Sequence, residues 1–232
     1  MSLANRLISA LPAHERGRFM AHSELVELKL ETLPGSEYAY FPVEGFVGLV
    51  LPMLAAPDVE VALVGHEGML NAALAFGLSN AGLRPVVQAA GRAIRIHGEA
   101  FEQRQAGDPC LRDVLHRYEQ VRQSQLAQQV ACVIRHSVEQ RLARWLLMAR
   151  DRAHSSELFL THEVLATMLG VRRESVTQAA RGFQNRGLIS YSRGYVMLLD
   201  NPGLELAACT CYEADLSAYQ RLLPQETHAL AP

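Results

Sequence analysis

The chain has 232 residues, a formal net charge of −2, 49% hydrophobic residues and 20% charged residues. This composition is typical of a folded globular protein and excludes a disordered chain. No apolar run approaches the roughly 20 residues that cross a membrane, and the N-terminus lacks the pattern of a signal peptide. We therefore expect a cytoplasmic protein without a membrane partner.

The positive charge is unevenly distributed along the chain. Residues 137–196 contain nine arginines against five acidic residues, a surplus of +4 that leaves −6 on the rest of the chain. A local basic surplus is the electrostatic pattern of a nucleic-acid-binding segment. This segment is therefore the first place to look for a DNA-binding element.

The four cysteines fit a reducing compartment, where structural disulfides are not expected. Cys110 and Cys132 are isolated in the sequence, and we expect both to be small buried residues. Cys209 and Cys211 form a Cys-x-Cys pair, but no paired Cys-x-x-Cys spacing typical of metal sites is present. We therefore expect no metal ion and no cofactor.

The first half of the chain favours β-structure. Residues up to about 23 predict one or two short helices. The segments 26–30, 38–53, 59–65 and 84–96 are short alternating or β-branched runs separated by glycine and proline. This pattern predicts a small antiparallel barrel or roll.

The pattern becomes helical after Gly107. Asp108 is a candidate N-cap, Pro109 suits the first helical position, and residues 111–136 contain no glycine or proline. Such a helix spans about 39 Å, longer than a small domain requires, so we expect it to join two copies of the chain. The predicted seam comprises Leu111, Leu115, Tyr118, Arg122, Leu126, Gln129 and Val133. The alternative is an ordinary helix packed on the β domain.

Residues 161–187 carry the spacing of a helix-turn-helix. Thr161 is a candidate N-cap of the first helix, and Ala166, Gly170 and Val176 follow the pattern A-x3-G-x5-V. Gly170 stands where the chain must turn sharply, a position that commonly needs positive φ. A preceding helix over 138–153 is expected to supply core residues.

The second helix of the motif is expected to bury one face and to present the other to DNA. Together with Thr161, the predicted DNA-contacting residues on and beside that face are Arg172, Arg173, Glu174, Ser175, Thr177, Gln178 and Arg181. Arginine pairs with guanine, glutamate accepts from cytosine, glutamine pairs with adenine, and a serine near the helix terminus suits a phosphate. A merely solvated helix face is the alternative.

Two strands are predicted over 188–191 and 195–199. The residues Ser192, Arg193 and Gly194 join them into a wing, with Arg193 at the tip and within reach of the phosphate backbone. Residues 202–219 predict one further helix packed on the winged domain.

The order of these parts resembles the CRP/FNR superfamily of regulators, most specifically in SVEQRLARWLL and LTHEVLATMLGVRRESVTQAARGFQNRGLISYSRG. The resemblance implies an α+β fold: an antiparallel β-roll of the cyclic-nucleotide-binding kind over 1–110, a dimerisation helix over 111–136 and a winged helix-turn-helix over 137–232. It implies a transcription factor that binds palindromic duplex DNA as a homodimer and contacts RNA polymerase. It also places Arg173, Glu174 and Gln178 at the family's base-contacting positions, where many members have arginine in place of Gln178.

The ligand site departs from that family pattern. Ala72 and Ala73 stand where cyclic-nucleotide binders have a Gly-Glu pair. Arg84 is expected to match their phosphate-binding arginine, but Pro85 follows it where they have a hydroxyl residue. We therefore expect any small-molecule effector to be something other than cyclic AMP, and its identity stays open. The iron-sulfur branch of the family uses N-terminal cysteines, and none precedes Cys110.

Three alternatives remain open at this point. One is a haem ligand among the histidines His14, His22, His66, His97 and His116. Another is a cupin-like metal-dependent enzyme fused to a DNA-binding module, although no H-x-H, G-x-S-x-G or P-loop motif is present and we expect no catalytic residues. The third is a regulator that acts without an effector.

Overall fold

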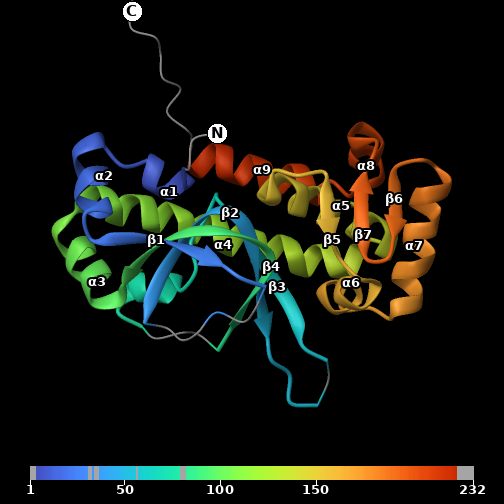
Figure 1. The fold of residues 1–232 in the computed structure, drawn as a ribbon, viewed down its shortest axis with the longest axis horizontal. Helices are drawn as coiled ribbons and strands as arrows, with labels where there is room; N and C mark the ends of the chain where they lie inside the picture. The colour runs from blue at the N-terminus through green and yellow to red at the C-terminus, as the bar shows by residue number, and fades with distance from the viewer. Residues whose placement is uncertain (1–3, 31–32, 34–36, 56, 79–81, 224–232) are drawn as a thin grey trace, which may run out of the picture.

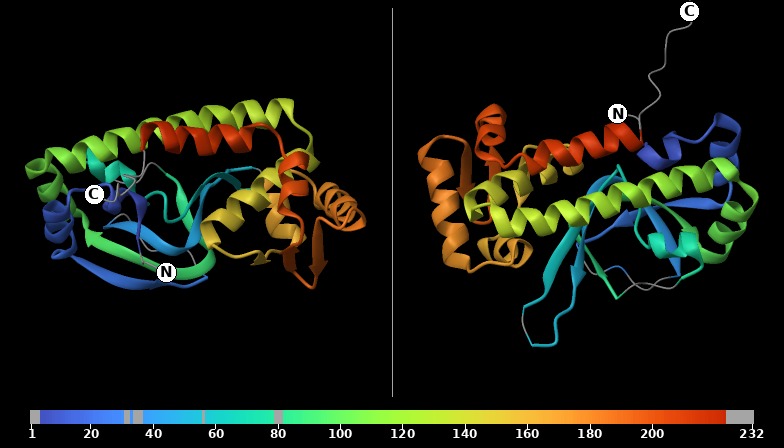
Figure 2. Two further views of the ribbon diagram at one scale, coloured as in Figure 1. Left: turned by 90° about the horizontal axis from the view of Figure 1, so that it is seen from above. Right: turned by 180° about the vertical axis from the view of Figure 1, so that it is seen from behind.

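The computed structural model describes residues 4–30, 33, 37–55, 57–78 and 82–223. The molecule is elongated, with a β-rich half at one end and a mostly helical half at the other (Figure 1). One long helix, α4, runs along both halves (Figures 1 and 2). None of the helices in the described segments is long and apolar enough to cross a membrane.

The β-rich half is built on a four-stranded antiparallel sheet with strand order β1-β4-β2-β3. Its strands are β1 (Ser23–Leu28), β2 (Tyr38–Leu51), β3 (Val59–Val64) and β4 (Arg84–His97). Strands β2, β3 and β4 lie within two residues of their predicted bounds, whereas β1 begins three residues before and ends two residues before the predicted segment 26–30. Before the sheet come two short helices, α1 (Arg6–Ser9) and α2 (Ala13–Met20), also as predicted.

The central strand β2 bends where it crosses β4. Gly45 has a φ of +72°, and a Cβ atom on Gly91 would overlap the backbone carbonyl of Glu44. The pairing register of β2 and β4 shifts in this region. Glycine is needed at both positions, because a side chain at either would push the two strands apart.

Two elements of this half were not predicted. A 3₁₀ helix, η1 (Ala72–Phe76), lies between β3 and β4, and the helix α3 (Gly98–Gly107) follows β4 directly. The weak amphipathic pattern of 98–107 gives no sign of α3, which is fixed by Phe101 in the core.

The long helix α4 (Pro109–Arg135) begins two residues before and ends one residue before the predicted range of 111–136. The side chain of Asp108 accepts a hydrogen bond of 3.0 Å from the Leu111 backbone N–H, which caps the helix as expected. The next helix, α5 (Val138–Ala153), begins with a capping box between Ser137 and Gln140. The break between α4 and α5 at His136 is the connection between the two halves of the molecule.

The helical half contains α6 (His162–Leu169), α7 (Arg173–Asn185) and a three-stranded sheet of order β5-β7-β6. The strands β6 (Ile189–Ser192) and β7 (Tyr195–Leu198) form the predicted wing, and β5 (Glu157–Phe159) is an additional strand paired with β7.

The prediction of one C-terminal helix is wrong. The chain forms α8 (Asn201–Ala207) and α9 (Cys211–Leu222), separated by an extended backbone at Ala208. Helix α8 packs on α5, whereas α9 packs along α4 and returns towards the β-rich half (Figure 2). There Arg6 Nη2 donates a hydrogen bond of 2.6 Å to the carbonyl of Leu223.

The two halves share buried contacts. Phe46 and Leu63 of the sheet lie in the same core cluster as Trp145 of α5. Arg152 of α5 forms a buried ion pair of 2.8 Å with Glu67. Helix α6 also contacts β3, so the helical half is packed directly against the roll in this conformation.

Candidate nucleic-acid interface

The helix-turn-helix is formed by α6 and α7. The Thr161 hydroxyl accepts a hydrogen bond of 3.2 Å from the Val164 backbone N–H, so Thr161 is the N-cap of α6, as predicted. Gly170 ends α6 with a φ of +61°, in the left-handed region that favours glycine. The sharp turn expected from the sequence is present.

Helix α7 has one buried and one exposed face. Val176, Ala179, Ala180 and Phe183 are buried in the core of the helical half. The opposite face forms a shallow open surface of Arg173, Glu174, Thr177, Gln178, Arg181, Gly182 and Asn185. Five of the predicted DNA-contacting residues are thus brought together, and Gly182 and Asn185 are additions at the far end.

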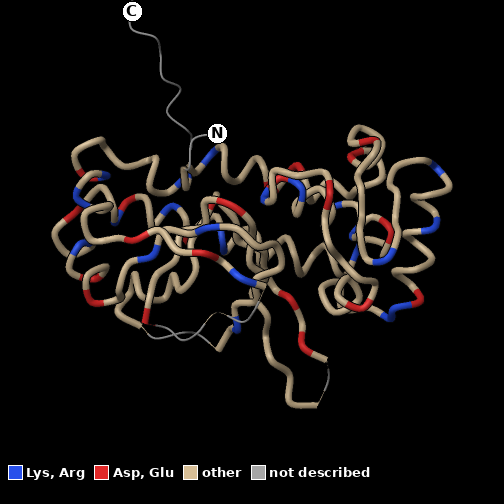
Figure 3. The backbone as a smooth tube through the Cα atoms, viewed as in Figure 1, with Lys and Arg blue, Asp and Glu red and all other residues tan. Residues whose placement is uncertain are grey.

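The exposed arginines near this surface lack acidic partners. Arg172, Arg173, Arg181 and Arg193 are exposed and form no ion pair with any described residue. Figure 3 shows basic residues recurring along α7 at the outer edge of the molecule. Free guanidinium groups on an exposed helix suit the phosphates and guanine edges of duplex DNA.

The basic surplus of residues 137–196 is only partly available to DNA. Arg141, Arg144 and Arg152 are buried, at 9%, 5% and 6% exposure. Arg144 binds Asp215 at 2.6 Å, and Arg152 binds Glu67 at 2.8 Å. Sequence counting overestimated the DNA-facing charge, because it could not distinguish arginines that bridge parts of the fold.

The wing ends in a tight two-residue turn. Ser192 pairs with Tyr195 across the hairpin, which leaves Arg193 and Gly194 as the turn, with φ values of +48° and +86°. Positive φ at both central residues matches the twist of a hairpin, and Arg193 is exposed at the tip. Ser175, by contrast, is half-buried at the start of α7.

His162 joins the wing to α7, a role that sequence reasoning missed. Its Nδ1 lies 2.9 Å from the Thr177 hydroxyl, and its ring stacks on Tyr191 with centroids 4.3 Å apart. Burial, together with the positive charges of Arg173 and Arg181, lowers the pKa of His162, so the ring is neutral near pH 7. Its position at the first residue of α6 gave no sequence signal of this contact.

The predicted dimer seam divides into two parts along α4. Leu111, Leu115 and Tyr118 are at most 2% exposed and belong to the chain's own core, so no second copy can reach them. Including them was wrong, because the first half of α4 covers the roll. Arg122 and Gln129 are half-buried, and Leu126 and Val133 are exposed.

The exposed part of α4 is strongly apolar. Leu126, Val130, Val133 and Ile134 are 41%, 61%, 51% and 72% exposed. Their spacing of four, three and one residues places them on one side of the helix. This apolar patch lies on the half of α4 nearer to the helix-turn-helix.

A cavity of about 270 Å³ lies between η1, the start of β4 and α4. Ala72, Ala73 and Pro85 line it, as do Glu119 and Arg122 of α4. Arg84 does not line it, because Arg84 forms an ion pair with Asp58. The expected correspondence of Arg84 with a phosphate-binding arginine is therefore not supported by its position.

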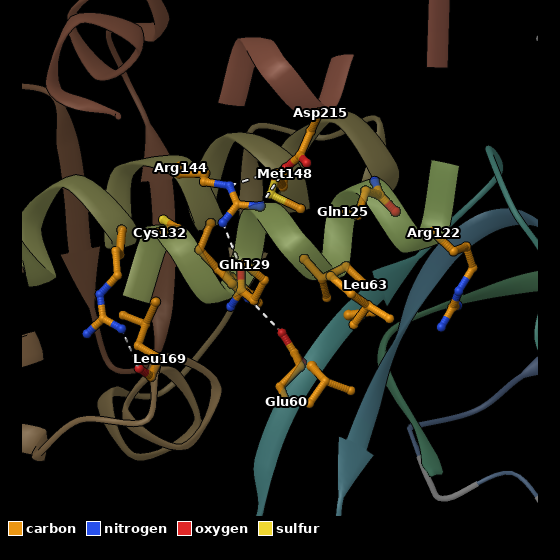
Figure 4. A pocket seen from close by; sticks show the side chains of 15 residues that line it. Glu60, Leu63, Arg122, Gln125, Gln129, Cys132, Arg144, Met148, Leu169 and Asp215 are labelled. Atoms are coloured by element: carbon orange, nitrogen blue, oxygen red, sulfur yellow. Dashed lines mark hydrogen bonds and ion pairs between the residues drawn. The ribbon is translucent and has the colours of Figure 1, made fainter. Parts of the chain in front are cut away.

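A second, smaller cavity of about 50 Å³ lies at the junction of β3, α4 and α5. Figure 4 shows Arg144 in this junction between Asp215 of α9 and Gln129 of α4. Trp145 of α5 also donates a hydrogen bond to Glu60 of β3 in this junction. The junction joins the two halves of the molecule and offers little space for a ligand.

The isolated cysteines differ from expectation in one case. Cys132 is buried, as predicted, but Cys110 is exposed because it lies at the outer side of the first turn of α4.

The candidate haem ligand His66 lies against His154, with ring centroids 4.4 Å apart, and burial lowers the pKa of His66.

Comparison with known proteins agrees with this architecture. Residues 140–207 match the model of the Crp-like helix-turn-helix domain. A comparison with curated protein sequences gave no significant match. Among solved structures, the chain is similar to FixK2 from Bradyrhizobium japonicum, with a TM-score of 0.66, 14% identity, and coverage of 81% of this chain and 98% of that one.

Two further structures share the fold. TTHA1359, a transcriptional regulator of the CRP/FNR family from Thermus thermophilus, has a TM-score of 0.65 and 22% identity, with coverage of 80% of this chain and 98% of that one. The c-di-GMP-responsive global regulator CLP from Xanthomonas campestris has a TM-score of 0.64 and 16% identity, with coverage of 82% and 100%. Residues 140–207 therefore carry a Crp-like helix-turn-helix domain, and the chain as a whole shares the fold of these solved structures over about four fifths of its length.

Proposed function

We propose that the protein binds palindromic DNA sites as a homodimer and reads them with α7. The observation that carries this proposal is the exposed face of α7, where Arg173, Glu174, Gln178 and Arg181 form one open surface. Its side chains present donors and acceptors at the end of a helix that projects from the molecule, as major-groove recognition requires.

The surface divides into reading and positioning residues. Arg173 and Glu174 lie in the first turn of α7 and Gln178 lies one turn later, so these three reach base edges. Arg193 at the wing tip and Arg172 before the helix contact phosphates, as do Ser175 and Thr161 through their hydroxyls. His162 fixes the position of the wing relative to α7, because it contacts Tyr191 of the wing and Thr177 of α7.

The second half of α4 joins the two copies. Its apolar patch of Leu126, Val130, Val133 and Ile134 has the spacing of a helix-helix seam and no cover within the described part of the chain. Two-fold pairing of this patch presents two copies of α7 on one side of the dimer. In this assignment residues 1–110 form the sensory domain, 111–136 the dimerisation helix and 137–232 the DNA-binding domain.

The cavity of about 270 Å³ is the proposed effector site. It is enclosed by the roll on one side and by Glu119 and Arg122 of α4 on the other, so a ligand there contacts the dimerisation helix directly. A ligand that prefers one position of α4 shifts the population of DNA-binding conformations.

The cytoplasm is the proposed location of this activity, and RNA polymerase is the proposed further partner.

Binding-site selection from random duplex DNA with the full-length protein tests the proposal. The selected sequence is expected to be a palindrome with half-site centres ~10 bp apart or a near multiple of that spacing. Arg173→Ala is expected to weaken binding by ~1–3 kcal/mol per half-site and to relax preference at one position.

Arg117→Ala is the matched control, because Arg117 is an exposed arginine of α4 that pairs with Asp113 away from α7. It removes the same charge and is expected to leave the selected motif unchanged. Failure to select any sequence, or an unchanged motif after Arg173→Ala, contradicts the assignment.

A further inference from the structure

Three cysteines and one histidine meet where α4 ends and the C-terminal helices begin. Cys132 lies in the last turn of α4 and His136 is its C-cap, while Cys209 lies before α9 and Cys211 is its first residue. The four candidate ligand atoms all lie within 4.8 Å of one another. This group, the Cys3His cluster, uses three of the chain's four cysteines.

The geometry of the cluster fits a single ion. Cys132 Sγ lies 3.6 Å from Cys209 Sγ, and Cys211 Sγ lies 3.5 Å from His136 Nδ1. A tetrahedral zinc ion with Zn–S of about 2.3 Å and Zn–N of about 2.0 Å holds its ligand atoms roughly 3.5–3.8 Å apart. The two separations already match the edges of such a tetrahedron.

The ligand set selects the kind of metal. Three thiolates and one imidazole form one of the usual structural zinc sets, and soft sulfur ligands disfavour magnesium and calcium. A polynuclear iron-sulfur cluster distributes its ligands over different irons, which places some of them farther apart than these four atoms. The cluster therefore suits one zinc ion and leaves no open position for a water ligand.

The surroundings support the charge of such a site. Three thiolates around one Zn²⁺ carry a net charge of −1, and the buried guanidinium of Arg144 interacts electrostatically with Cys132. Gln128 Nε2 donates a hydrogen bond of 2.9 Å to Cys211 Sγ, which orients that ligand. All three sulfur ligands are buried, and His136 is half-buried.

We propose that Cys132, His136, Cys209 and Cys211 bind one zinc ion that fastens the start of α9 to the end of α4. His136 is the residue at which α4 gives way to α5, so the ion also fixes the connection between the two halves of the molecule. The sequence expectation of no metal was drawn from spacing along the chain. The cluster forms only because α9 folds back on α4, which brings together residues 77 positions apart.

Metal analysis of the full-length protein tests this site. After expression in zinc-supplemented medium and dialysis, we expect inductively coupled plasma mass spectrometry to find one zinc ion per chain. A mercurial reagent that modifies thiolates is expected to release this ion. Cys209→Ser and His136→Ala are each expected to lower zinc affinity by at least 10-fold, a typical effect of losing a ligand or its support.

Cys110→Ser is the matched control, because Cys110 is exposed and lies outside the cluster; it is expected to keep the full zinc content. Circular dichroism of each variant shows whether it is folded, and cobalt substitution of the wild type checks geometry independently through the absorption of a tetrahedral thiolate site. The proposal would be overturned if the protein contained no bound metal, or iron with sulfide in place of zinc. It would also be overturned by a disulfide between Cys132 and Cys209, or by full zinc retention in Cys209→Ser.

Discussion

The indole Nε1 of Trp145 donates a hydrogen bond of 2.9 Å to the Glu60 carboxylate, which joins α5 of the helical half to β3 of the roll. Gln88 donates to the other carboxylate oxygen. Burial nevertheless raises the pKa of Glu60 to about 7, because the two hydrogen bonds and the charge of Arg152 only partly offset the loss of solvation.

The stability of the protein should therefore fall as the pH rises through Glu60's titration. Below its ordinary pKa of 4.5 the side chain is neutral in both states, and between 4.5 and about 7 only the folded state holds the proton. The free energy of unfolding decreases across that pH window, by roughly 3 kcal/mol in total. At higher pH the folded state contains a buried, charged carboxylate.

Glu60→Gln should flatten this pH dependence. A glutamine keeps an acceptor for Trp145, and its amide can donate to Gln88 Oε1, which has no hydrogen-bond partner among the described residues. Urea unfolding of the variant and the wild type at pH 5 and pH 8 measures the difference, with Glu27→Gln on the exposed side of β1 as control. Equal slopes for Glu60→Gln and wild type would show that Glu60 titrates normally.

Arg193→Ala should weaken binding to all DNA sequences alike. Arg193 lies at the exposed tip of the wing, and in the proposed assignment it contacts the phosphate backbone and no base edge. The slope of log affinity against log salt concentration should decrease by about one unit for each phosphate contact removed. Fluorescence anisotropy over a range of salt concentrations measures this slope, and a changed sequence preference would assign Arg193 to base reading instead.

Gln178→Arg should shift the preferred base from adenine towards guanine at one position of each half-site. Gln178 is exposed on the α7 surface, and arginine matches the O6 and N7 acceptors of guanine. Binding-site selection with this variant provides the measurement. Gln184→Arg on the same helix adds the same charge outside that surface and should leave the base preference unchanged.

Val130→Glu combined with Ile134→Glu should convert the proposed dimer to monomers. The two side chains are among the most exposed apolar residues of α4, and glutamates there place like charges across the two-fold axis. Sedimentation velocity at micromolar concentration distinguishes the two states. Leu206→Glu on α8, at a residue that is 89% exposed, is the control and should remain dimeric.

Cyclic AMP should not bind with low-micromolar or higher affinity. Ala72, Ala73 and Pro85 in the roll cavity offer no carboxylate for a ribose and no hydroxyl for a phosphate, and Arg84 is engaged with Asp58. Each missing charge-assisted hydrogen bond removes ~1.5–3 kcal/mol. Titration calorimetry measures the affinity directly, and a low-micromolar dissociation constant would contradict the reasoning.

The sequence by itself determined the features that depend on local chemistry. Asp108 and Pro109 begin α4, Thr161 caps α6, and Gly170 forms the turn between α6 and α7, because capping and positive φ depend on neighbouring residues only. The four strands of the roll and the two faces of α7 followed from hydrophobic periodicity, which is also local.

Only the tertiary structure decided which residues are buried in the chain's own core and which stay exposed. Leu115 and Val133 stand on the same helical stripe, yet one is buried under the roll and the other is exposed, because the roll covers only the first half of α4. Arg144 and Arg173 contribute equally to the charge count, but packing turned Arg144 inward to Asp215. The meeting of Cys132 with Cys209 depends on the path of α9 along α4, which is set by burial of apolar surface between distant segments and leaves no pattern in the spacing of the cysteines.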